Sequence, residues 1–501
     1  MKKAFAFFLA LLLILPLLPS CGEKEPAETT AATDGTTDGS VDIPTTPAVT
    51  EELPAVVETS FDGYTFVILA CGNLNNSTTA NDFGGTENDA DVLEQAKYIR
   101  KLSVESKCDI LFEILNKIKY NSCNGSGVGY KAMQESYTAN AFDYDAAMIG
   151  TYDAANLAVG NMLYNINEMK EIDLSHSWWD QKAVEGLSFG KNLYLATGDI
   201  GIIDNIITHA ILFNKEIVKS NSDLRDPYEL VRNKAWTLDV LAEEVLKFGG
   251  DLNGDDLLDE NDAYGASIWN EATNSMLASA KVRIATLKDG QLELTVNSDR
   301  AATLFDKFIT LCATDKVFNY NTALPSSVWD KARTEMFDNG QILYYITTMN
   351  AVPKHRDSQT DFGILPHPML DESQEDYSVC AGLSANMFLC FPAFLEDASR
   401  SATVMEMCAY YGKKILTPAY YERTLVGNYV RDEESIEMLD IIYSHRMYDP
   451  GLIFRIGKYG TQFSSMLGQK TNSYASILAP SQRAAEADIK KINASLLAVS
   501  D

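Results

Sequence analysis

Positive charge is scarce in this sequence. Its 501 residues include 41 lysines and arginines against 70 aspartates and glutamates, which gives a formal net charge of −29 at pH 7. A surface this acidic repels nucleic acid and anionic lipid, so the composition argues against either as an electrostatic partner. It fits a soluble protein exposed to salt and divalent cations.

Histidine is also rare, and no catalytic motif is complete. The histidines, none of which belongs to an H-E-x-x-H pair, are His176, His209, His355, His367 and His445. Their scatter argues against a catalytic zinc site. The segment GLSFG around Ser188 matches the G-x-S-x-G pattern of a nucleophile elbow. A helical segment precedes it and a strand-like one follows, the reverse of the order that the elbow requires. We therefore predict that the protein is not an enzyme.

A hydrophobic run long enough to span a membrane is missing too. The apolar run at residues 4–18 follows Lys2 and Lys3 and is too short for a comfortable span. It ends at LPSC, which resembles the lipobox of bacterial lipoproteins. That resemblance implies that residues 1–20 are a signal peptide, cleaved off before Cys21, and that Cys21 carries a lipid. An ordinary secretory signal is the alternative. We expect an exported protein, lipid-anchored on the extracellular face of the cell membrane.

Aromatic residues are absent from residues 21–59, where Thr, Pro and acidic residues dominate. Such a segment cannot bury enough apolar surface to offset its chain entropy, so we predict a disordered tether. The remaining residues, 60–501, are too many for one core and predict two domains.

Cysteine spacing gives no disulfide framework. Without Cys21, seven cysteines remain, an odd number at irregular spacing. Cys312 and Cys408 lie on apolar faces of expected helices, so we expect both to be buried. The others could include one bridge, which the sequence does not choose: Cys71, Cys108, Cys123, Cys380 and Cys390.

The body begins with a pattern typical of parallel α/β architecture. Apolar strands are expected at residues 64–71, 108–115 and 143–150, with a helix over 88–107 between the first two. In open parallel sheets, ligands bind beyond the carboxyl ends of the strands. Residues 71–76 and 150–153 are therefore the first places to expect a pocket. Nothing repeats at a fixed period, which argues against solenoids and propellers.

Several segments resemble a known family in order and spacing. They are FNK from Phe213, WTLDVLAEEV from Trp236, NGQILYY from Asn339, DFGILPHP from Asp361 and YYERTLVGNYVRDEESIEMLDII from Tyr420. Together they resemble the family 1 extracellular solute-binding proteins, the substrate-binding proteins of ABC transporters with the type II periplasmic-binding-protein fold of maltose-binding protein.

The resemblance implies an α/β fold of two lobes joined by a hinge. We expect one lobe to comprise residues 60–203 and 380–428, and the other residues 204–379 and 429–501. The chain would cross between them in a strand near residues 201–208 and again near residues 378–382.

Sugar pockets pair aromatic platforms with amide or carboxylate partners. The resemblance implies that the segment holding Trp269 contributes an aromatic residue to the cleft. Strand ends, strand alternation and tandem tryptophans supply the other candidates. Core packing is the alternative for Trp269 and for the tandem tryptophans Trp178 and Trp179. The candidate ligand-binding residues are Trp269, Asn270, Tyr152, Asp153, Tyr345, Tyr344, Asn76 and Trp178.

The segment DLNGDDLLDENDAYG from Asp251 matches the ligand spacing of an EF-hand loop. Side-chain ligands would be Asp251, Asn253, Asp255, Asp259 and Asp262, with the carbonyl of Leu257 at position 7. Two positions depart from the pattern, because Asp256 replaces the usual Gly and Asp262 the usual Glu. We predict a structural calcium ion and no organic cofactor; a hydrated acidic turn is the alternative.

These observations predict a monomeric binding protein that captures a carbohydrate, an oligosaccharide, by hinge closure and delivers it to the permease subunits of an ABC importer. The closest alternative keeps the fold but binds a peptide, amino acid or other polar solute, and a carboxylate-bearing ligand would need an arginine in the cleft. A secreted hydrolase and a surface adhesin are further alternatives.

Overall fold

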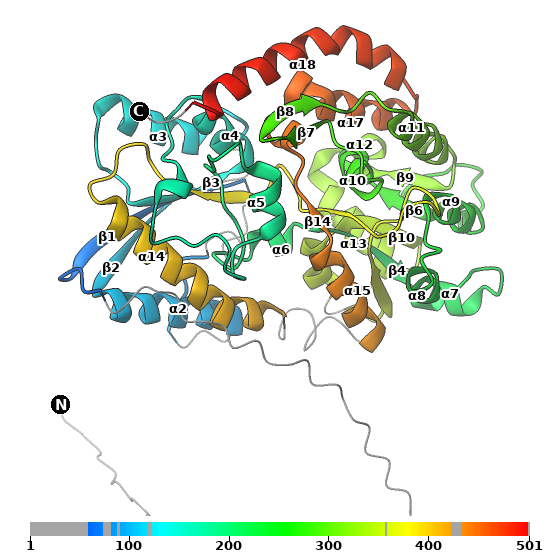
Figure 1. Cartoon of the computed structure of the whole chain (residues 1–501). Helices are drawn as coiled ribbons and strands as arrows, with labels where there is room; N and C mark the ends of the chain where they lie inside the picture. The colour runs from blue at the N-terminus through cyan, green and yellow to red at the C-terminus, as the bar shows by residue number, and fades with distance from the viewer. Residues whose placement is uncertain are drawn as a thin grey trace, which may run out of the picture. The chain divides into compact units, whose positions relative to one another are not determined.

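The computed structural model describes residues 59–73, 82–87, 91–118, 123–355, 358–421 and 432–498. All of these described residues fall within a single compact unit. Two separate sheets, each covered by helices, organise this unit (Figure 1). No helix in these ranges has both the length and the apolar character needed to cross a bilayer.

The first sheet has the strand order β13-β3-β1-β2. Its strands are β1 (Tyr64–Cys71), β2 (Ile110–Asn116), β3 (Ala146–Gly150) and β13 (Met387–Cys390). The first three are parallel and β13 is antiparallel to β3. Parallel strands need crossover helices, and those helices cover both faces. This explains why β1 and β3 are continuously apolar.

Alternate residues of β1 enter different core layers. Phe66 and Ile68 pack with residues of α2 (Val92–Cys108) and α14 (Ala398–Tyr411). Leu69 and Cys71 pack with residues of α3 (Val128–Ala139) and α4 (Thr151–Val159) on the other side.

The second sheet has the order β11-β4-β10-β6-β5, with β9 paired to β6. Its strands are β4 (His209–Asn214), β5 (Gly249–Gly250), β6 (Ala263–Ile268), β9 (Val317–Asn319), β10 (Ile342–Thr348) and β11 (Phe362–Leu365). The central strands β4, β10 and β6 are almost wholly buried. Their core includes residues of α9 (Leu238–Leu246) and α11 (Asp299–Cys312). The predicted α/β class is confirmed.

The chain passes from one sheet to the other through short segments. Before β4 it forms the helix α6 (Ile203–Ile206), where we predicted a strand. After β11 it runs through β12 (Val379–Cys380) into β13. β12 pairs in parallel with β14 (Arg446–Met447), which follows α15 (Glu433–Ser444).

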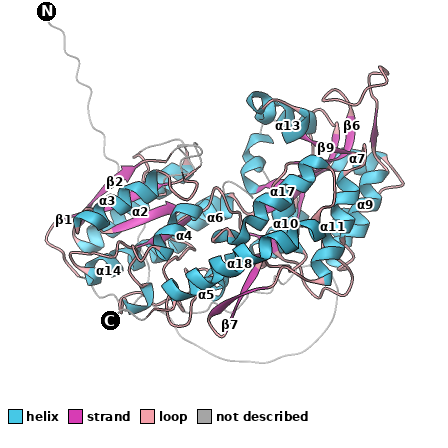
Figure 2. Cartoon of the chain, turned by 90° about the horizontal axis from the view of Figure 1, so that it is seen from above, coloured by secondary structure: helices cyan, strands magenta, loops and turns pink. Residues whose placement is uncertain are grey.

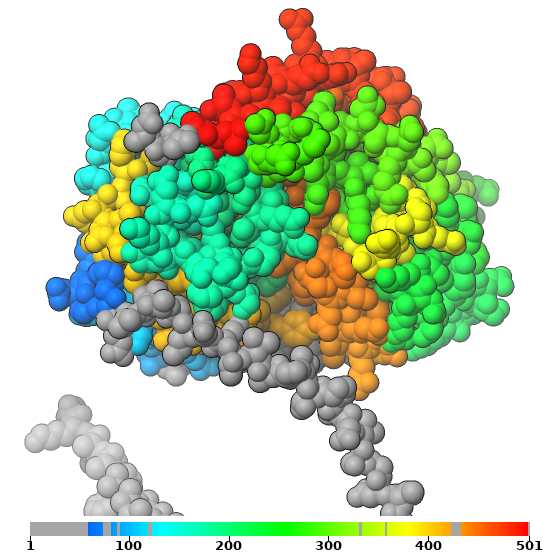
Figure 3. All heavy atoms as spheres, viewed as in Figure 1, coloured from blue at the N-terminus to red at the C-terminus, as the bar shows by residue number. Residues whose placement is uncertain are grey.

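The molecule has two halves, the first built on the sheet that contains β1 and the second on the sheet that contains β4. The C-terminal helix α18 (Tyr474–Leu496) contacts both halves. It packs on α17 (Tyr459–Gln469), which lies against α10 (Ala272–Ser279) of the second half, and also on α4 of the first. Figures 1 and 2 show it lying across the molecule, and in Figure 3 its atoms form part of the upper edge.

The smaller elements connect these parts. They are η1 (Ile166–Glu168), α5 (Gln181–Leu187), α7 (Lys215–Ser220), α8 (Pro227–Arg232), β7 (Ala285–Lys288), β8 (Gln291–Leu294), α12 (Tyr320–Ala323), η2 (Ser326–Val328), α13 (Trp329–Asp338), η3 (Met349–His355), η4 (Gly412–Leu416), α16 (Pro450–Ile453) and η6 (Ile456–Lys458).

All seven cysteines of the described part are buried, including Cys312 and Cys408 as expected, and none of them is in a disulfide. Burial raises the pKa of the Cys71 thiol to about 12 and that of Cys108 to about 11. These thiols therefore pack as small apolar groups rather than as nucleophiles.

Candidate binding cleft

A cavity of about 600 Å³ is lined by residues from both halves of the molecule. From the first half come Asn73, just after β1, and Tyr152, just after β3, at the carboxyl ends of parallel strands as expected. From the second come residues that follow β6, β9 and β10, while residues 382–385 and 452–464 complete the wall. The volume is in the usual range for a small-molecule pocket.

An aromatic platform forms part of the wall. Trp269 follows β6, and its indole stacks on the imidazole of His209, with ring centroids 5.3 Å apart and 13° between the planes. His209 opens β4 and is buried, which lowers its pKa to about 3. The imidazole is therefore uncharged at neutral pH. Within the described residues its Nδ1 makes no hydrogen bond.

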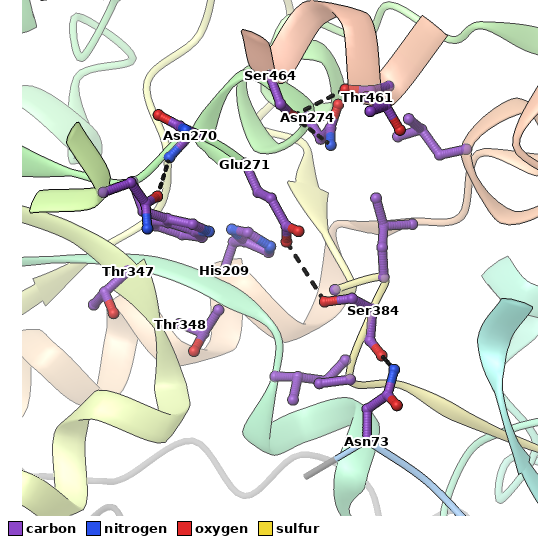
Figure 4. Close-up of a pocket in the computed structure, with 18 of the residues that line it drawn as sticks. Asn73, His209, Asn270, Glu271, Asn274, Thr347, Thr348, Ser384, Thr461 and Ser464 are labelled. Atoms are coloured by element: carbon purple, nitrogen blue, oxygen red, sulfur yellow. Dashed lines mark hydrogen bonds between the residues drawn. The ribbon is translucent and has the colours of Figure 1, made fainter. Parts of the chain in front are cut away.

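Asparagines surround this platform (Figure 4). The backbone N–H of Asn270 donates to the side-chain oxygen of Asn321 at 2.7 Å, and Asn319 donates to the side-chain oxygen of Asn270 at 2.9 Å. Asn274 donates to Ser464 Oγ at 3.5 Å, while its own side-chain oxygen accepts no hydrogen bond within the described part. These amides supply fixed polar groups beside an apolar face.

A carboxylate, Glu271, points across the cavity. Ser384 Oγ, in the segment between β12 and β13, donates to Glu271 Oε2 at 3.5 Å (Figure 4). Solvent still reaches this side chain, yet the surrounding protein raises its pKa. Asn73 fixes the opposite wall, because its side chain donates to the carbonyl of Ser384 at 2.6 Å and to that of Cys123 at 3.0 Å.

Three cationic side chains also line the cavity. Arg333, on α13, donates to Tyr320 Oη at 3.4 Å. The guanidinium of Arg455 lies 5.0 Å from the ring centroid of Tyr152. Lys458 follows at the end of η6. Sequence reasoning missed these three residues and His209, since no local motif marks them.

Three of the predicted ligand-binding residues line the cavity: Trp269, Asn270 and Tyr152. Asp153, the next residue after Tyr152, does not. Helix α4 turns its side chain inward, where it accepts hydrogen bonds from the backbone N–H groups of Gly125, Gly127 and Tyr130 at 2.7–3.0 Å. This carboxylate fixes the start of α3 instead of meeting a ligand.

The prediction that Tyr344 or Tyr345 faces the cleft is corrected, because both are buried in core. Tyr344 packs against Trp236, and Tyr345 against Phe337. Strand β10 lies between β4 and β6, and both of its faces are covered, so alternation exposes neither ring. The cavity is reached instead by Thr347 and Thr348, at the end of this strand (Figure 4).

Trp178 is also a core residue. It is 1% exposed, and its indole N–H donates to Glu406 Oε1 at 3.0 Å. Its neighbour Trp179 donates to Glu406 Oε2 at 2.9 Å. Trp178 and Trp179 are therefore both core residues, which is the alternative given for them above. Asn76 and Cys21 lie outside the described residues.

In the acidic loop, carboxylates accept hydrogen bonds from the loop's own backbone. Asp251 accepts from Gly254 and Asp256, and Asp262 accepts from Leu252 and Asp259, at 2.6–2.9 Å. The bonds to Asp262 lower its pKa. Asp256, at position 6, has φ of 62°, the left-handed conformation that glycine usually supplies there.

Across the described residues, no group of three or more carboxylate, histidine or cysteine side chains is arranged to hold a metal ion. The carboxylates Asp251, Asp255, Asp259 and Asp262 therefore form no such group in this conformation, and Leu257 is exposed. Calcium binding by this loop stays a prediction.

No protein-family model and no curated protein sequence matches the chain. Solved structures do. A cyclo/maltodextrin-binding protein complexed with maltotetraose is 12% identical with a TM-score of 0.54, over 87% of this chain and 98% of that one. An ABC substrate-binding protein from Listeria monocytogenes in complex with cycloalternan is 11% identical with a TM-score of 0.51, over 87% and 99%.

The GacH receptor of Streptomyces glaucescens, solved unliganded and with acarbose, is 12% identical with a TM-score of 0.51, over 86% of this chain and 98% of that one. At such low identity these likenesses establish the fold. The chain therefore has the type II periplasmic-binding-protein fold of the family 1, maltose-binding-protein-like solute-binding proteins, as the resemblance in its sequence predicts.

Proposed function

We propose that the protein is a solute-binding protein that captures an oligosaccharide in its cleft and delivers it to an ABC importer. The fold supports this, since structural neighbours were solved with maltotetraose, cycloalternan and acarbose. The observation that carries the proposal is the cavity itself, in which the Trp269–His209 stack lies beside Asn270 and Asn274. Sugars present apolar C–H faces ringed by hydroxyls, and this pairing of flat ring and amides complements them.

Binding would work by closure of the two halves around the ligand. Ligand contacts made by both halves, such as those of Tyr152 and Trp269, favour the closed form because only there are they made together. Shifting an equilibrium from 1:99 to 99:1 takes about 5.5 kcal/mol. One or two stacking contacts at ~0.5–1.5 kcal/mol and several hydrogen bonds at ~1 kcal/mol reach that value.

A binding role fits this cleft better than hydrolysis. The hydroxyl of Ser188 donates to the carbonyl of Val184 at 2.6 Å, and Ser188 is not among the residues that line the cavity. The imidazole nearest the cavity, His209, stacks on Trp269 and has its pKa lowered to about 3, which makes it a poor general base. In this proposal the ligand leaves intact.

The proposal includes two features that rest on sequence. The LPSC segment supports a lipid on Cys21 and a place on the outer face of the membrane. The spacing from Asp251 to Asp262 supports a calcium ion that braces a loop next to β6. Neither feature is needed for the cleft to bind sugar.

A thermal-shift screen of neutral and acidic mono- and oligosaccharides tests the binding proposal. A ligand that binds only the native state raises Tm. We expect at least one glycan to raise Tm in the wild type and in Phe142→Ala, which removes an aromatic ring that is 62% exposed and lies outside the cavity. The same glycan should have little effect on Trp269→Ala. A screen in which no glycan acts, while a peptide or amino acid does, contradicts the proposal.

A further inference from the structure

The residues that line the cavity differ in charge from the chain as a whole. Acidic residues outnumber basic ones 70 to 41 overall. Among the described residues that line the cavity, the only acidic one is Glu271, against Arg333, Arg455 and Lys458. Since the chain as a whole is strongly acidic, an excess of cationic over acidic side chains in the cavity lining calls for a specific reason.

An unusual backbone presents two of these cations. Arg455 and Lys458 both have φ of 54°, and Gly457 between them has φ of 55°. Left-handed residues other than glycine cost roughly 1–2 kcal/mol each, and such conformations gather at functional sites. The segment is held in place from outside the cavity, because Asp488 of α18 accepts the backbone N–H of Gly457 at 2.9 Å.

Neither cation is paired with a carboxylate of the described residues. Arg455 donates to the carbonyl of Asn124 at 2.9 Å and lies over the ring of Tyr152. The ammonium group of Lys458 makes no hydrogen bond or ion pair with any described residue. Both side chains are exposed to solvent in the cavity. Their charge is therefore available to a ligand.

We infer that the cleft takes an acidic carbohydrate, one whose sugars carry carboxylate or sulfate groups, with Arg455 and Lys458 facing the anionic group. This inference rests on the proposed function and names its ligand class. A guanidinium matches the two oxygens of a carboxylate or sulfate, and an ammonium adds a point charge. Trp269 would stack on a sugar ring, while Glu271 would accept hydrogen bonds from hydroxyls. A neutral sugar would leave both cations without a counter-ion.

Calorimetric titration with matched glycans tests the inference. The probes are uronate oligosaccharides and sulfated oligosaccharides, each paired with its neutral counterpart made by carboxyl reduction or desulfation. We expect an acidic member to bind at least about tenfold tighter than its neutral partner, since hydrogen bonds to charged groups are worth roughly 1.5–3 kcal/mol. That advantage should shrink in high salt.

Single substitutions test whether the preference for acidic glycans depends on Arg455 and Lys458. Lys458→Gln and Arg455→Gln should each weaken the acidic glycan about tenfold while changing the affinity for its neutral partner little. Two variants are used because Arg455→Gln also removes the bond to Asn124. Lys470→Gln is the matched control, since Lys470 is an exposed lysine with φ of 51° that lies outside the cavity. It should bind as the wild type does.

The possible failures are distinguishable. If neutral glycans bind as tightly as acidic ones, or if Lys458→Gln weakens both equally, the ligand-class inference is overturned and carbohydrate binding stands. If no glycan of either kind binds, the proposed function falls and the inference falls with it. If only non-carbohydrate anions such as acidic peptides bind, the function is wrong although the cations do meet an anion.

Discussion

Two tryptophan–histidine ring contacts among the described residues, one tilted and one stacked, have different surroundings. They are called the first and the second stack below. Trp178 lies against His176 with ring centroids 4.1 Å apart, and Trp269 lies against His209 at 5.3 Å. In the first pair a buried carboxylate, Glu406, accepts from His176 and from the indole at 2.9–3.0 Å. In the second pair Nδ1 of the histidine makes no hydrogen bond within the described part, and Trp269 is only half-buried.

The two pairs consist of the same residue types, so the residue types do not tell a core pair from a pair at a cavity. The hydrogen-bond partners of their polar atoms do. The first stack is closed, since its polar atoms meet a carboxylate inside the core. The second leaves a ring face and neighbouring amides open to a cavity. We therefore expect changes at the first to alter stability alone and changes at the second to alter ligand affinity.

The largest expected effect is on the closed stack. Glu406→Ala removes the acceptor of two indole N–H groups and of His176, leaving buried donors unsatisfied at about 1–3 kcal/mol each. We expect the free energy of unfolding to fall by about 3–5 kcal/mol in urea titrations, with glycan affinity of the folded fraction unchanged. Glu406→Gln keeps one acceptor and should lose less. If Glu406→Ala were as stable as the wild type, the hydrogen bonds to Glu406 would not be what holds the first stack in the core.

The open stack should respond in the opposite way. Trp269→Ala removes a platform for a sugar ring, and we expect the affinity for the glycan found by thermal shift to fall about 30-fold, ~2 kcal/mol, in calorimetry. Phe142→Ala serves as the control, because its ring is exposed away from the cavity. Equal affinities of wild type and Trp269→Ala would place the ligand elsewhere.

A smaller effect concerns pH. Burial lowers the pKa of His209 to about 3 from its usual 6.5, so below pH 6.5 the unfolded chain binds more protons at this residue than the folded one. Stability from this group is complete above pH 6.5 and is lost as pH falls towards 3. Between pH 7.5 and 5.5 we expect a loss of about 1.4 kcal/mol that His209→Gln lacks.

Urea unfolding of both proteins at the two pH values measures this difference directly. His367 lies 5.8 Å from His209 ring to ring, and its pKa is lowered first by burial and then by His209. The burial of His367, the larger cause, is present in both proteins. Identical pH dependence in the two proteins would show that His209 carries no such penalty.

The smallest effect is expected at the acidic loop, which touches neither stack. With a Kd of about 1 mM, 5 mM calcium would stabilise the native state by about 1 kcal/mol without changing glycan affinity. Asp251→Ala should abolish the rise in Tm, whereas Leu258→Ala, in the same loop but outside the predicted ligands, should keep it. No rise in the wild type would favour the hydrated turn.

The sequence predicted the fold well where local pattern determines it. The continuous apolar runs of β1 and β3 indicated parallel strands covered on both faces, and the rule about strand ends led to Tyr152. Tyr344 and Tyr345 were misjudged because alternation assumes that one face of β10 is open. Arg455, Lys458 and His209 could not be found in this way, since their place in the cavity depends on packing between segments far apart in the chain.

Small-angle X-ray scattering with and without a saturating glycan tests most directly the claim that the two halves close on a carbohydrate. We expect the radius of gyration of the wild type to decrease on adding the glycan, and no decrease in Trp269→Ala at the same concentration. An unchanged radius of gyration in wild type at a saturation confirmed by calorimetry would contradict the account.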